Sequence, residues 1–358
     1  MRRHSLFIVA AVAVLAAGCG GGSTTQTTSS GAASSTQQFD SVTLASVNNM
    51  LHLPEFVAQQ EGFFAENGLN VKFQMLSGGA AINQAMQSGT AQFGGVSDTS
   101  VATARAAGLL IRLVAPGMND ATTATYAGPL AVIGRADRGI KANDPSSLIG
   151  KRVGAQSGST NLEYLHLLLA KNNIPLNKVT IVPITSDQQP VSLRQGDIDA
   201  AANWEPYVSE MVSELGSNAA VVSRGEPLMG YTVGVSSPET VIAAQQTVLD
   251  KFAASLAEAS HWIRANKAAA AAVAPNFITG LKPQYALDAM DHLSFDPRIS
   301  GCTEQAFTTE SKSLAASGAI KSSGPGSEMI DPSIISAVQQ QHPEWFSDLP
   351  AIPASCGG

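Results

Sequence analysis

The chain has 358 residues, of which 44% are hydrophobic and 14% charged, and its formal net charge is −7. This acidic balance argues against binding to nucleic acid or to an anionic lipid surface, because both repel a negatively charged protein. The length and the apolar content are sufficient for a large core and indicate two domains or lobes.

The first residues have the features of an export signal. Arg2 and Arg3 precede an apolar stretch over residues 6–17, and small residues lead from there to Cys19. This order predicts a signal peptide over residues 1–18. The apolar stretch is about half the roughly 20 residues that span a bilayer, which argues against a transmembrane helix.

Cys19, at the expected cleavage point, resembles the cysteine of the lipobox in bacterial lipoproteins. The resemblance implies that its thiol is acylated and that the protein is anchored to the outer face of the cell membrane by lipid alone. The alternative is an ordinary signal peptide with an incidental cysteine. Residues 19–39 consist mostly of Gly, Ser, Thr, Gln and Ala, which predicts a flexible linker after the lipidated N-terminus.

From residue 40 onward, strand-type and helix-type periodicities alternate, and the last third is helix-rich. Predicted strands cover residues 42–45, 71–75, 92–96, 111–115, 130–133, 153–155, 179–184, 198–202 and 231–235. Predicted helices cover residues 53–66, 80–88, 97–107, 161–172, 187–195, 205–215, 238–266, 267–274, 283–292, 303–317 and 332–341. The alternation indicates an α/β fold with mostly parallel sheets.

Two of the predicted strands bracket the middle of the chain. The strands at 130–133 and 231–235 are expected to cross from one lobe to the other, which would make the first lobe discontinuous. We therefore expect lobe 1 to begin over residues 40–130, lobe 2 to occupy residues 131–230, and the rest of lobe 1 with the C-terminal helices to occupy residues 231–358.

Small polar residues follow several predicted strands, where ligands bind in open parallel sheets. Three such junctions, at residues 77–80, 96–100 and 156–161, precede predicted helices. Their backbone N–H groups and hydroxyls suit an anionic group, and the helix dipole adds favourable potential. Ordinary helix capping by Ser, Thr and Asp is the alternative. Two further junctions are residues 48–52 and Trp204, whose indole could cover a small ligand or belong to the core.

The cysteines and the absence of catalytic or cofactor motifs limit the chemistry that we expect of this chain. Cys302 and Cys356 remain as a pair in an oxidising compartment, which favours a disulfide over the alternative of two free thiols. The sequence contains no metal-type histidine spacing, no Ser-His-Asp arrangement, and no P-loop or dinucleotide fingerprint. We therefore expect no cofactor, no metal and no catalytic residue, and a protein that is not an enzyme.

Several sequence blocks resemble the NMT1-like substrate-binding lipoproteins of nitrate, sulfonate and taurine ABC importers. In the first lobe they are PEFVAQQEGFFAENGLNVKF, SGGAAINQAMQSGTAQFGGVSDTSVATARAAG and IRLVAP. In the second they are SSLIGKRVGAQSGSTNLEYLHLLLAKNNI and RQGDIDAAANWEPYVSEM. Their order and spacing cover about residues 42–236.

The resemblance implies a two-lobed periplasmic-binding-protein fold of type II, with a ligand cleft between lobes that close about a hinge. It also implies delivery of a small molecule to ABC permease and ATPase subunits by a protein that acts as a monomer. By position, the residues implied to line the ligand are Asn49, Met50, Gly78, Gly79, Ser97, Asp98, Ser157, Ser159, Thr160 and Trp204.

The ligand class follows from the charges of these loops. None carries an arginine, the usual clamp for sulfonate or carboxylate. Asp98 would repel a simple anion and could pair with an ammonium group, which favours a zwitterion or an amine-bearing neutral molecule over nitrate or a bare sulfonate. Alternatively, Asp98 only caps the helix that begins at Thr99.

Two other functions fit the same fold. A ligand-sensing lipoprotein would have the same sequence features. Thiamine-pyrimidine-precursor binding proteins and enzymes resemble this chain in outline, but their cysteine-rich motif is missing, since no cysteine lies between Cys19 and Cys302.

Overall fold

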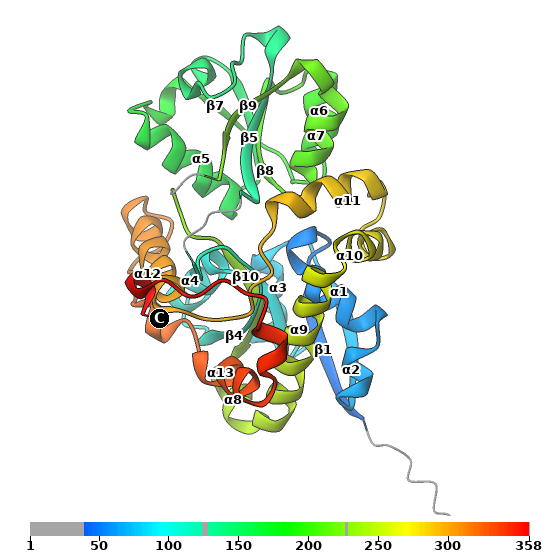
Figure 1. Ribbon diagram of the computed structural model, residues 1–358. Coiled ribbons are helices and arrows are strands. Elements are labelled where there is room, and N and C mark those ends of the chain that lie inside the picture. Colours follow the sequence, from blue (N-terminus) through cyan, green and yellow to red (C-terminus); the bar gives the residue numbers. More distant parts are fainter. Residues whose placement is uncertain (1–38, 124–127, 226–227, 358) are drawn as a thin grey trace, which may run out of the picture. The chain divides into compact units, whose positions relative to one another are not determined.

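The computed structural model describes residues 39–123, 128–225 and 228–357, which form two β-sheets covered by helices (Figure 1). The predicted signal peptide, the proposed lipid anchor Cys19 and nearly all of the linker lie outside the described residues. Within the part of the chain that is described, no helix is both long and apolar enough to cross a membrane.

The first sheet combines strands from the beginning of the chain with one strand from much later. β1 runs parallel to β2 and β3, and β10 runs antiparallel to β3 and β4. In spatial order the strands are β2 (Leu69–Met75), β1 (Asp40–Ser46), β3 (Phe93–Ser97), β10 (Thr232–Pro238) and β4 (Ile111–Asn119).

The second sheet is built from the middle of the chain in the same pattern. β6 runs parallel to β7 and β8, and β5 runs antiparallel to β8 and β9. In spatial order the strands are β7 (Thr180–Pro183), β6 (Arg152–Ala155), β8 (Ala200–Trp204), β5 (Leu130–Arg135) and β9 (Ala219–Arg224).

Each sheet therefore contains one reversed strand, which is β10 in the first sheet and β5 in the second. Both are the first strand that the chain forms after it passes from one sheet to the other. A chain that enters a lobe from the cleft must run away from it, whereas the other strands run toward it. The two strands expected at the crossings are these two, and each belongs to a single sheet. Residues 124–127 and 226–227 of the crossing segments lie outside the described residues.

Helices cover both faces of each sheet, and alternating side chains along a strand reach opposite layers. Leu44 packs in the layer of α1, α9 and α13, whereas the adjacent Ala45 packs with α3, α4 and α12. Val132 faces α5, and Ile133 faces α6 and α7. These helices are α1 (Leu53–Gln60), α3 (Gly79–Gln87), α4 (Asp98–Ala106), α5 (Thr160–Lys171), α6 (Gln189–Gln195), α7 (Tyr207–Leu215), α9 (Gln246–Ala265), α12 (Gly301–Ala316) and α13 (Pro332–Gln341).

Some predicted elements differ in their limits. The helix expected over 53–66 is divided into α1 and α2 (Phe63–Glu66), because Gly62 adopts a φ of 91° that ends the helical path. The helix expected over 238–266 is divided into α8 (Glu239–Ala244) and α9. Strand β9 was not predicted, although its Ala-Ala-Val-Val run carries the signal of a buried strand. Helices α10 (Lys267–Val273) and α11 (Pro283–Ala289) complete the C-terminal region.

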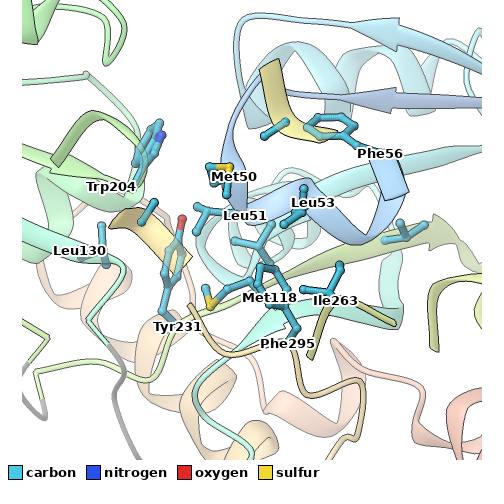
Figure 2. Packing of buried hydrophobic residues seen from close by; sticks show 14 of the residues in the cluster. Met50, Leu51, Leu53, Phe56, Met118, Leu130, Trp204, Tyr231, Ile263 and Phe295 are labelled. Atoms are coloured by element: carbon cyan, nitrogen blue, oxygen red, sulfur yellow. The ribbon is translucent and has the colours of Figure 1, made fainter. Parts of the chain in front are cut away.

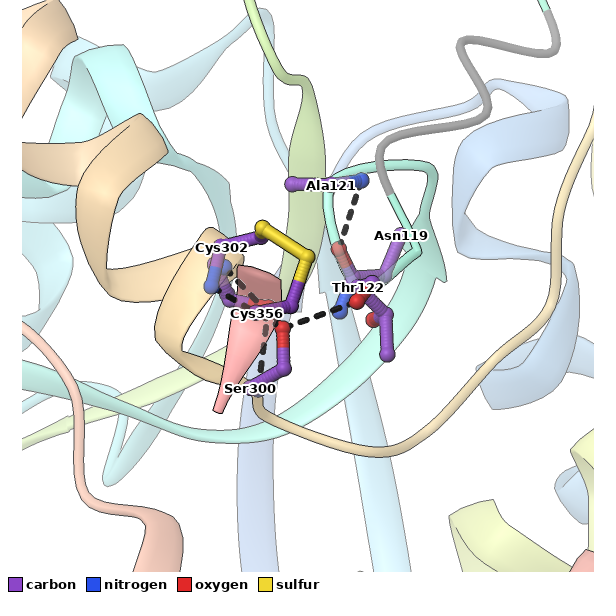
Figure 3. The surroundings of a disulfide bond; sticks show 7 residues. Asn119, Ala121, Thr122, Ser300, Cys302 and Cys356 are labelled. Atoms are coloured by element: carbon purple, nitrogen blue, oxygen red, sulfur yellow. Dashed lines mark hydrogen bonds between the residues drawn. A yellow bond between two sulfur atoms is a disulfide. The ribbon is translucent and has the colours of Figure 1, made fainter. Parts of the chain in front are cut away.

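The two remaining cysteines, Cys302 and Cys356, lie side by side (Figure 3). The structure joins Cys302, in the first turn of α12, to Cys356, with a Cα–Cα distance of 4.7 Å. Ser300 caps the same helix by accepting the N–H groups of Cys302 and Thr303, and it donates to the carbonyl oxygen of Thr122 at 2.8 Å. The C-terminus, the start of α12 and the segment after β4 thus meet at one point.

Candidate ligand-binding site

A cavity of about 140 Å³ lies where the loops that follow β1, β2 and β3 of the first sheet meet those that follow β6 and β8 of the second. The carboxyl ends of these parallel strands converge here with the N-termini of the helices that follow them, as in other open α/β sheets that bind ligands. We call it the inner cavity.

Eight of the ten residues predicted to line a ligand line the inner cavity, and two do not. The eight are Asn49, Gly78, Gly79, Ser97, Ser157, Ser159, Thr160 and Trp204. The two others, Met50 and Asp98, are both fully buried behind its wall.

Met50 belongs to the hydrophobic core. Figure 2 shows it beside Leu51 among the buried apolar side chains of the core. The adjacent residue explains its direction: Asn49 accepts the N–H of Leu51 at 3.0 Å through its side chain, which starts a short 3-10 turn. The turn directs Met50 into the core, so Met50 does not line the cavity as the sequence had suggested.

Asp98 is held away from the cavity by two backbone hydrogen bonds. Its carboxylate accepts the backbone N–H of Thr99 at 2.7 Å and that of Thr232 at 3.3 Å. Thr99 also donates its hydroxyl to Glu310 at 2.6 Å, which brings a second acid close. Burial, and next the negative charge of Glu310, raise the pKa of Asp98 well above its usual range. The expected pairing of Asp98 with a ligand ammonium is therefore not supported by this geometry.

Two helices begin at the inner cavity without a side-chain cap. Neither Gly78, before α3, nor Ser159, before α5, accepts a hydrogen bond from the following turn through its side chain. The first N–H groups of a helix have no partner within it and carry the positive end of the helix dipole. One start comes from each lobe, so a ligand in the cavity would meet unpaired donors from both sides.

Close packing at the start of α3 depends on glycine. A Cβ at Gly79 would lie 2.0 Å from the Oγ of Ser100, in the first turn of α4. The two helix starts can therefore lie this close together only because Gly79 has no side chain. Gly78, with a φ of 156°, would bring a Cβ within 3.3 Å of the Nε2 of Gln156 across the cavity.

Gln156 was not predicted as a site residue, although it directly follows β6. Its Oε1 accepts both the N–H and the hydroxyl of Ser186 at 3.1 Å, which fixes the orientation of the amide. Its Nε2 must then face the other way, toward Gly78. Gln156 thus offers a positioned donor to the cavity, and its position after a strand is the signal that could have identified it.

Trp204 lines the cavity at the end of β8 with only 8% of its surface exposed. Its Nε1 is buried and has no hydrogen-bond partner among the described residues. An indole N–H is a donor only, and leaving a buried donor unpaired costs about 1–3 kcal/mol. The adjacent Glu205 is held by Arg224 at 2.6 Å and accepts the N–H of Ser209 at 3.0 Å, which fixes the chain directly after the indole.

His52 is a second cavity residue that was not predicted. It is buried and lines the inner cavity, and its Nδ1 lies 2.8 Å from Oε1 of the buried Glu55. A Cβ at Gly95 would lie within 2.8 Å of both side chains. The pair is therefore packed flat against a glycine of β3, which holds the imidazole in the wall.

The inner cavity is polar and carries little charge. Its lining contains hydroxyl, amide and backbone groups and His52, and none of its lining residues is Asp, Glu, Lys or Arg. Among the described residues, no group of three or more His, Cys, Asp or Glu side chains is arranged to hold a metal ion. The cavity can solvate a negative group through N–H donors and helix dipoles.

Comparison with known proteins gives one family and a set of similar structures. The sequence profile of the NMT1/THI5-like family matches residues 49–270. The taurine-binding periplasmic protein of Escherichia coli (strain K12) is 26% identical over 222 residues, which cover 59% of this chain and 66% of that protein, just under two thirds of its length.

Solved structures agree with the fold. The periplasmic aliphatic sulphonate binding protein SsuA from Escherichia coli superimposes with a TM-score of 0.68 at 16% identity, covering 82% of this chain and 92% of that one. The periplasmic nitrate-binding protein NrtA from Synechocystis PCC 6803 gives a TM-score of 0.68 at 11% identity, covering 88% and 91%. At these identities the likeness establishes the two-lobed periplasmic-binding-protein fold.

Proposed function

The chain belongs to the NMT1/THI5-like family, and on that premise we propose that it is an extracytoplasmic solute-binding protein. Its ligand is a small sulfonate-type anion or zwitterion, which it delivers to the permease and ATPase subunits of an ABC importer. It acts by binding and release, without catalysis. The taurine, sulphonate and nitrate binding proteins among its relatives and structural neighbours support this assignment.

The observation that carries the proposal is the pair of uncapped helix starts, α3 and α5, that face one cavity from opposite lobes. A tetrahedral sulfonate has three acceptor oxygens, and it can take N–H groups from both helices at once. Gln156 and Trp204 add two side-chain donors. Because the donors come from both lobes, the bound anion would hold the lobes together.

Titration calorimetry on the purified chain tests this directly. We expect taurine or a short alkanesulfonate to bind, and to stabilise the protein by a few kcal/mol when its concentration is well above Kd. Nitrate is expected to bind more weakly, because it is smaller than the cavity requires. Absence of binding by every sulfonate tested would overturn the proposal.

A substitution at the cavity tests the donors. Gln156→Glu replaces an amide donor with a carboxylate of the same shape, and we expect sulfonate affinity to fall at least about tenfold, since a charge-assisted hydrogen bond contributes about 1.5–3 kcal/mol. Gln195→Glu is the matched control, because Gln195 is exposed and lines no cavity. Equal losses in both variants would mean that net charge, not the cavity donor, controls binding.

The lipid anchor and the disulfide belong to the same proposal. We propose that Cys19 is acylated and holds the protein at the membrane, and that Cys302 and Cys356 are bonded in the native protein. In producing cells, Cys19→Ser should shift the protein from the membrane fraction to the soluble fraction. Alkylation of the unfolded, unreduced protein should leave Cys302 and Cys356 unmodified, and modification of both would contradict the bridge.

A further inference from the structure

One imidazole in the wall of the inner cavity has a nitrogen that the protein leaves free. His52 is buried and lines the cavity, and Glu55 holds its Nδ1 at 2.8 Å. Its Nε2 makes no hydrogen bond within the described part of the chain, yet it does not belong to the fully enclosed side-chain atoms that lack a partner. Nε2 is therefore accessible from the cavity and can contact a ligand there.

The partner of Nδ1 determines what Nε2 can do. Both oxygens of Glu55 are engaged, because Oε2 accepts the hydroxyl of Ser46 at 2.5 Å and Oε1 lies against Nδ1 of His52. An ionised carboxylate only accepts hydrogen bonds, so the hydrogen of the neutral ring lies on Nδ1. Nε2 then carries a lone pair, which repels the oxygens of an anion. A protonated ring instead has a donor at Nε2 and a positive charge.

The surrounding charges favour a protonated ring once an anion is bound. Glu55 is buried, and its one ion-pair partner among the described residues is His52. The lining of the inner cavity contains no Lys or Arg that could take the place of the imidazole. With a neutral ring, a bound sulfonate and Glu55 would be two buried negative charges with no cation between them. Because unpaired buried charge is costly, the ligand should stabilise the imidazolium.

The elements packed against His52 bring few other titratable groups to it. α1 supplies Glu55, and Tyr231, directly before β10, lines the cavity. Burial raises the pKa of the Tyr231 phenol, so it stays neutral near pH 7. β3 and the cavity lining from the second lobe contain no titratable side chain. Arg112, at the start of β4, is paired with Glu239 at 2.9 Å. A change of charge in the wall near neutral pH is therefore expected at His52.

We propose that His52 contacts the anionic group of the ligand through Nε2 and that binding is coupled to the uptake of one proton from the solvent by its ring. Glu55 is a positioning residue, because it holds the ring and its hydrogen on Nδ1 and does not itself line the cavity. This inference rests on the proposed function and concerns how binding at the same site depends on protons. The affinity should be highest at low pH and fall as the pH rises through the range in which histidine loses its proton.

Calorimetry with ethane-1-sulfonate tests the proton uptake, because this ligand keeps its charge over the whole range. Titrations in buffers that differ in enthalpy of ionisation give the number of protons bound per ligand. We expect that number to rise toward one between pH 5 and pH 8, and the affinity to fall by up to about tenfold per pH unit as it does.

Binding without proton uptake at any pH would overturn the inference and leave the proposed function standing. Failure of ethane-1-sulfonate and taurine alike to bind at any pH would overturn both. These measurements use the wild-type chain, so they do not depend on the folding of a variant.

Substitution of the imidazole locates the effect. His52→Gln keeps a donor but stays neutral, so proton uptake should disappear and the affinity at pH 6 should fall about tenfold. His261→Gln is the matched control, since His261 lies on α9 and does not line the cavity. Glu310 and Asp120, the buried acids with a pKa raised to about 7, are present in both variants and cancel in the comparison. Proton uptake that persists in His52→Gln would contradict the role of the imidazole.

Substitution of the carboxylate tests the positioning role. Glu55→Gln removes the negative charge that stabilises the imidazolium, so the fall in affinity should begin at a lower pH than in the wild-type protein. A purely structural role would lower stability or affinity without moving the pH profile. An unshifted profile in Glu55→Gln would therefore contradict the coupling of Glu55 to the ring.

Discussion

Helices α3 and α4 begin next to each other at the same cavity, but only one of the two starts is closed by the protein itself. At α4, Ser97 accepts the N–H of Ser100 at 3.3 Å, and Asp98 accepts the N–H of Thr99. At α3, the preceding residue is Gly78, which has no side chain to offer. The capped start of α4 therefore has a structural role, whereas the N–H groups at the uncapped start of α3 remain available to a ligand.

Small polar residues after a strand therefore do not by themselves define a binding site. Both starts have that composition, and tertiary partners decide between them. Thr232 and Glu310, from distant parts of the chain, engage Asp98 and Thr99 at the closed start. Among the described residues, no side chain accepts the first N–H groups of α3, and the contacts with α4 there are the packing of Ser100 against Gly79 and a hydrogen bond from Asn83 to the carbonyl of Ser100. Stability is therefore expected to depend on the closed side and affinity on the open side.

The largest expected effect comes from removing the disulfide. It tests whether the region around the capped start of α4 can be destabilised without a change in ligand affinity. Replacing Cys302 and Cys356 together by Ser removes the covalent link at the start of α12, the helix that carries Glu310. The link closes a loop of 54 residues, so its loss should lower the free energy of unfolding by about 4 kcal/mol. Urea unfolding measures this.

Sulfonate affinity of the same variant, measured by calorimetry where it remains folded, should be unchanged. Reduction of the wild-type protein is the control and should give the same loss of stability. A large fall in affinity would show that the two sides are not independent.

The uncapped start of α3 is tested by adding a side chain there. Gly79→Ala places a methyl group where Ser100 lies, so one of the two helix starts must shift. Such overpacking typically costs about 1–3 kcal/mol, and we expect sulfonate affinity to fall as well. Gly324→Ala is the control, since its new Cβ would make ordinary contact at 3.5 Å with Met329. A variant that loses stability but keeps full affinity would separate α3 from the binding site.

The buried acids predict how stability varies with pH. Burial raises the pKa of Glu310 to about 7, and burial also raises that of Asp120 to about 7. An acid with a raised pKa in the folded state binds its proton more tightly there than in the unfolded chain, so these groups favour folding at low pH. Their contribution is lost as the pH rises from about 4.5 to about 7.

The wild-type protein should therefore unfold more easily at pH 8 than at pH 5. Asp348, whose pKa is lowered to about 2, acts in the opposite direction only below this range. Glu310→Gln mimics the protonated acid and should flatten the dependence, whereas Glu304→Gln, exposed on the same helix, should not. Parallel pH profiles for all three proteins would show that Glu310 does not titrate in this range.

The smallest effect is expected at the cap itself. Ser97→Ala removes the side chain that closes α4 and should lower the free energy of unfolding by about 1 kcal/mol. We expect sulfonate affinity to change little, although Ser97 lines the cavity. Ser77→Ala, at an exposed hydroxyl that lines the same cavity, should leave stability unchanged. If Ser97→Ala abolished binding, the closed start would be a ligand contact after all.

The sequence predicted the alternation of strands and helices and the cavity edge, because both depend on local periodicity and on residues next to strand ends. It could not predict the direction of Asp98. The partner that turns this side chain inward, the N–H of Thr232, lies 134 residues away. The role of Gln156 was equally hidden, since the orientation of its amide is fixed by Ser186, 30 residues further along. Side-chain direction in this site depends on contacts that join distant segments.

The hydroxyl groups between the lobes have a fixed polarity. Thr99 gives its proton to Glu310, and it therefore accepts the proton of Thr160, which comes from the other lobe. Thr160 in turn must accept from Ser97, 3.2 Å away. The relay orients every proton toward the interior and leaves none of them on the cavity side. Ser97 can thus present only a lone pair to an incoming anion, and the line of hydroxyl groups joins the two lobes by hydrogen bonds.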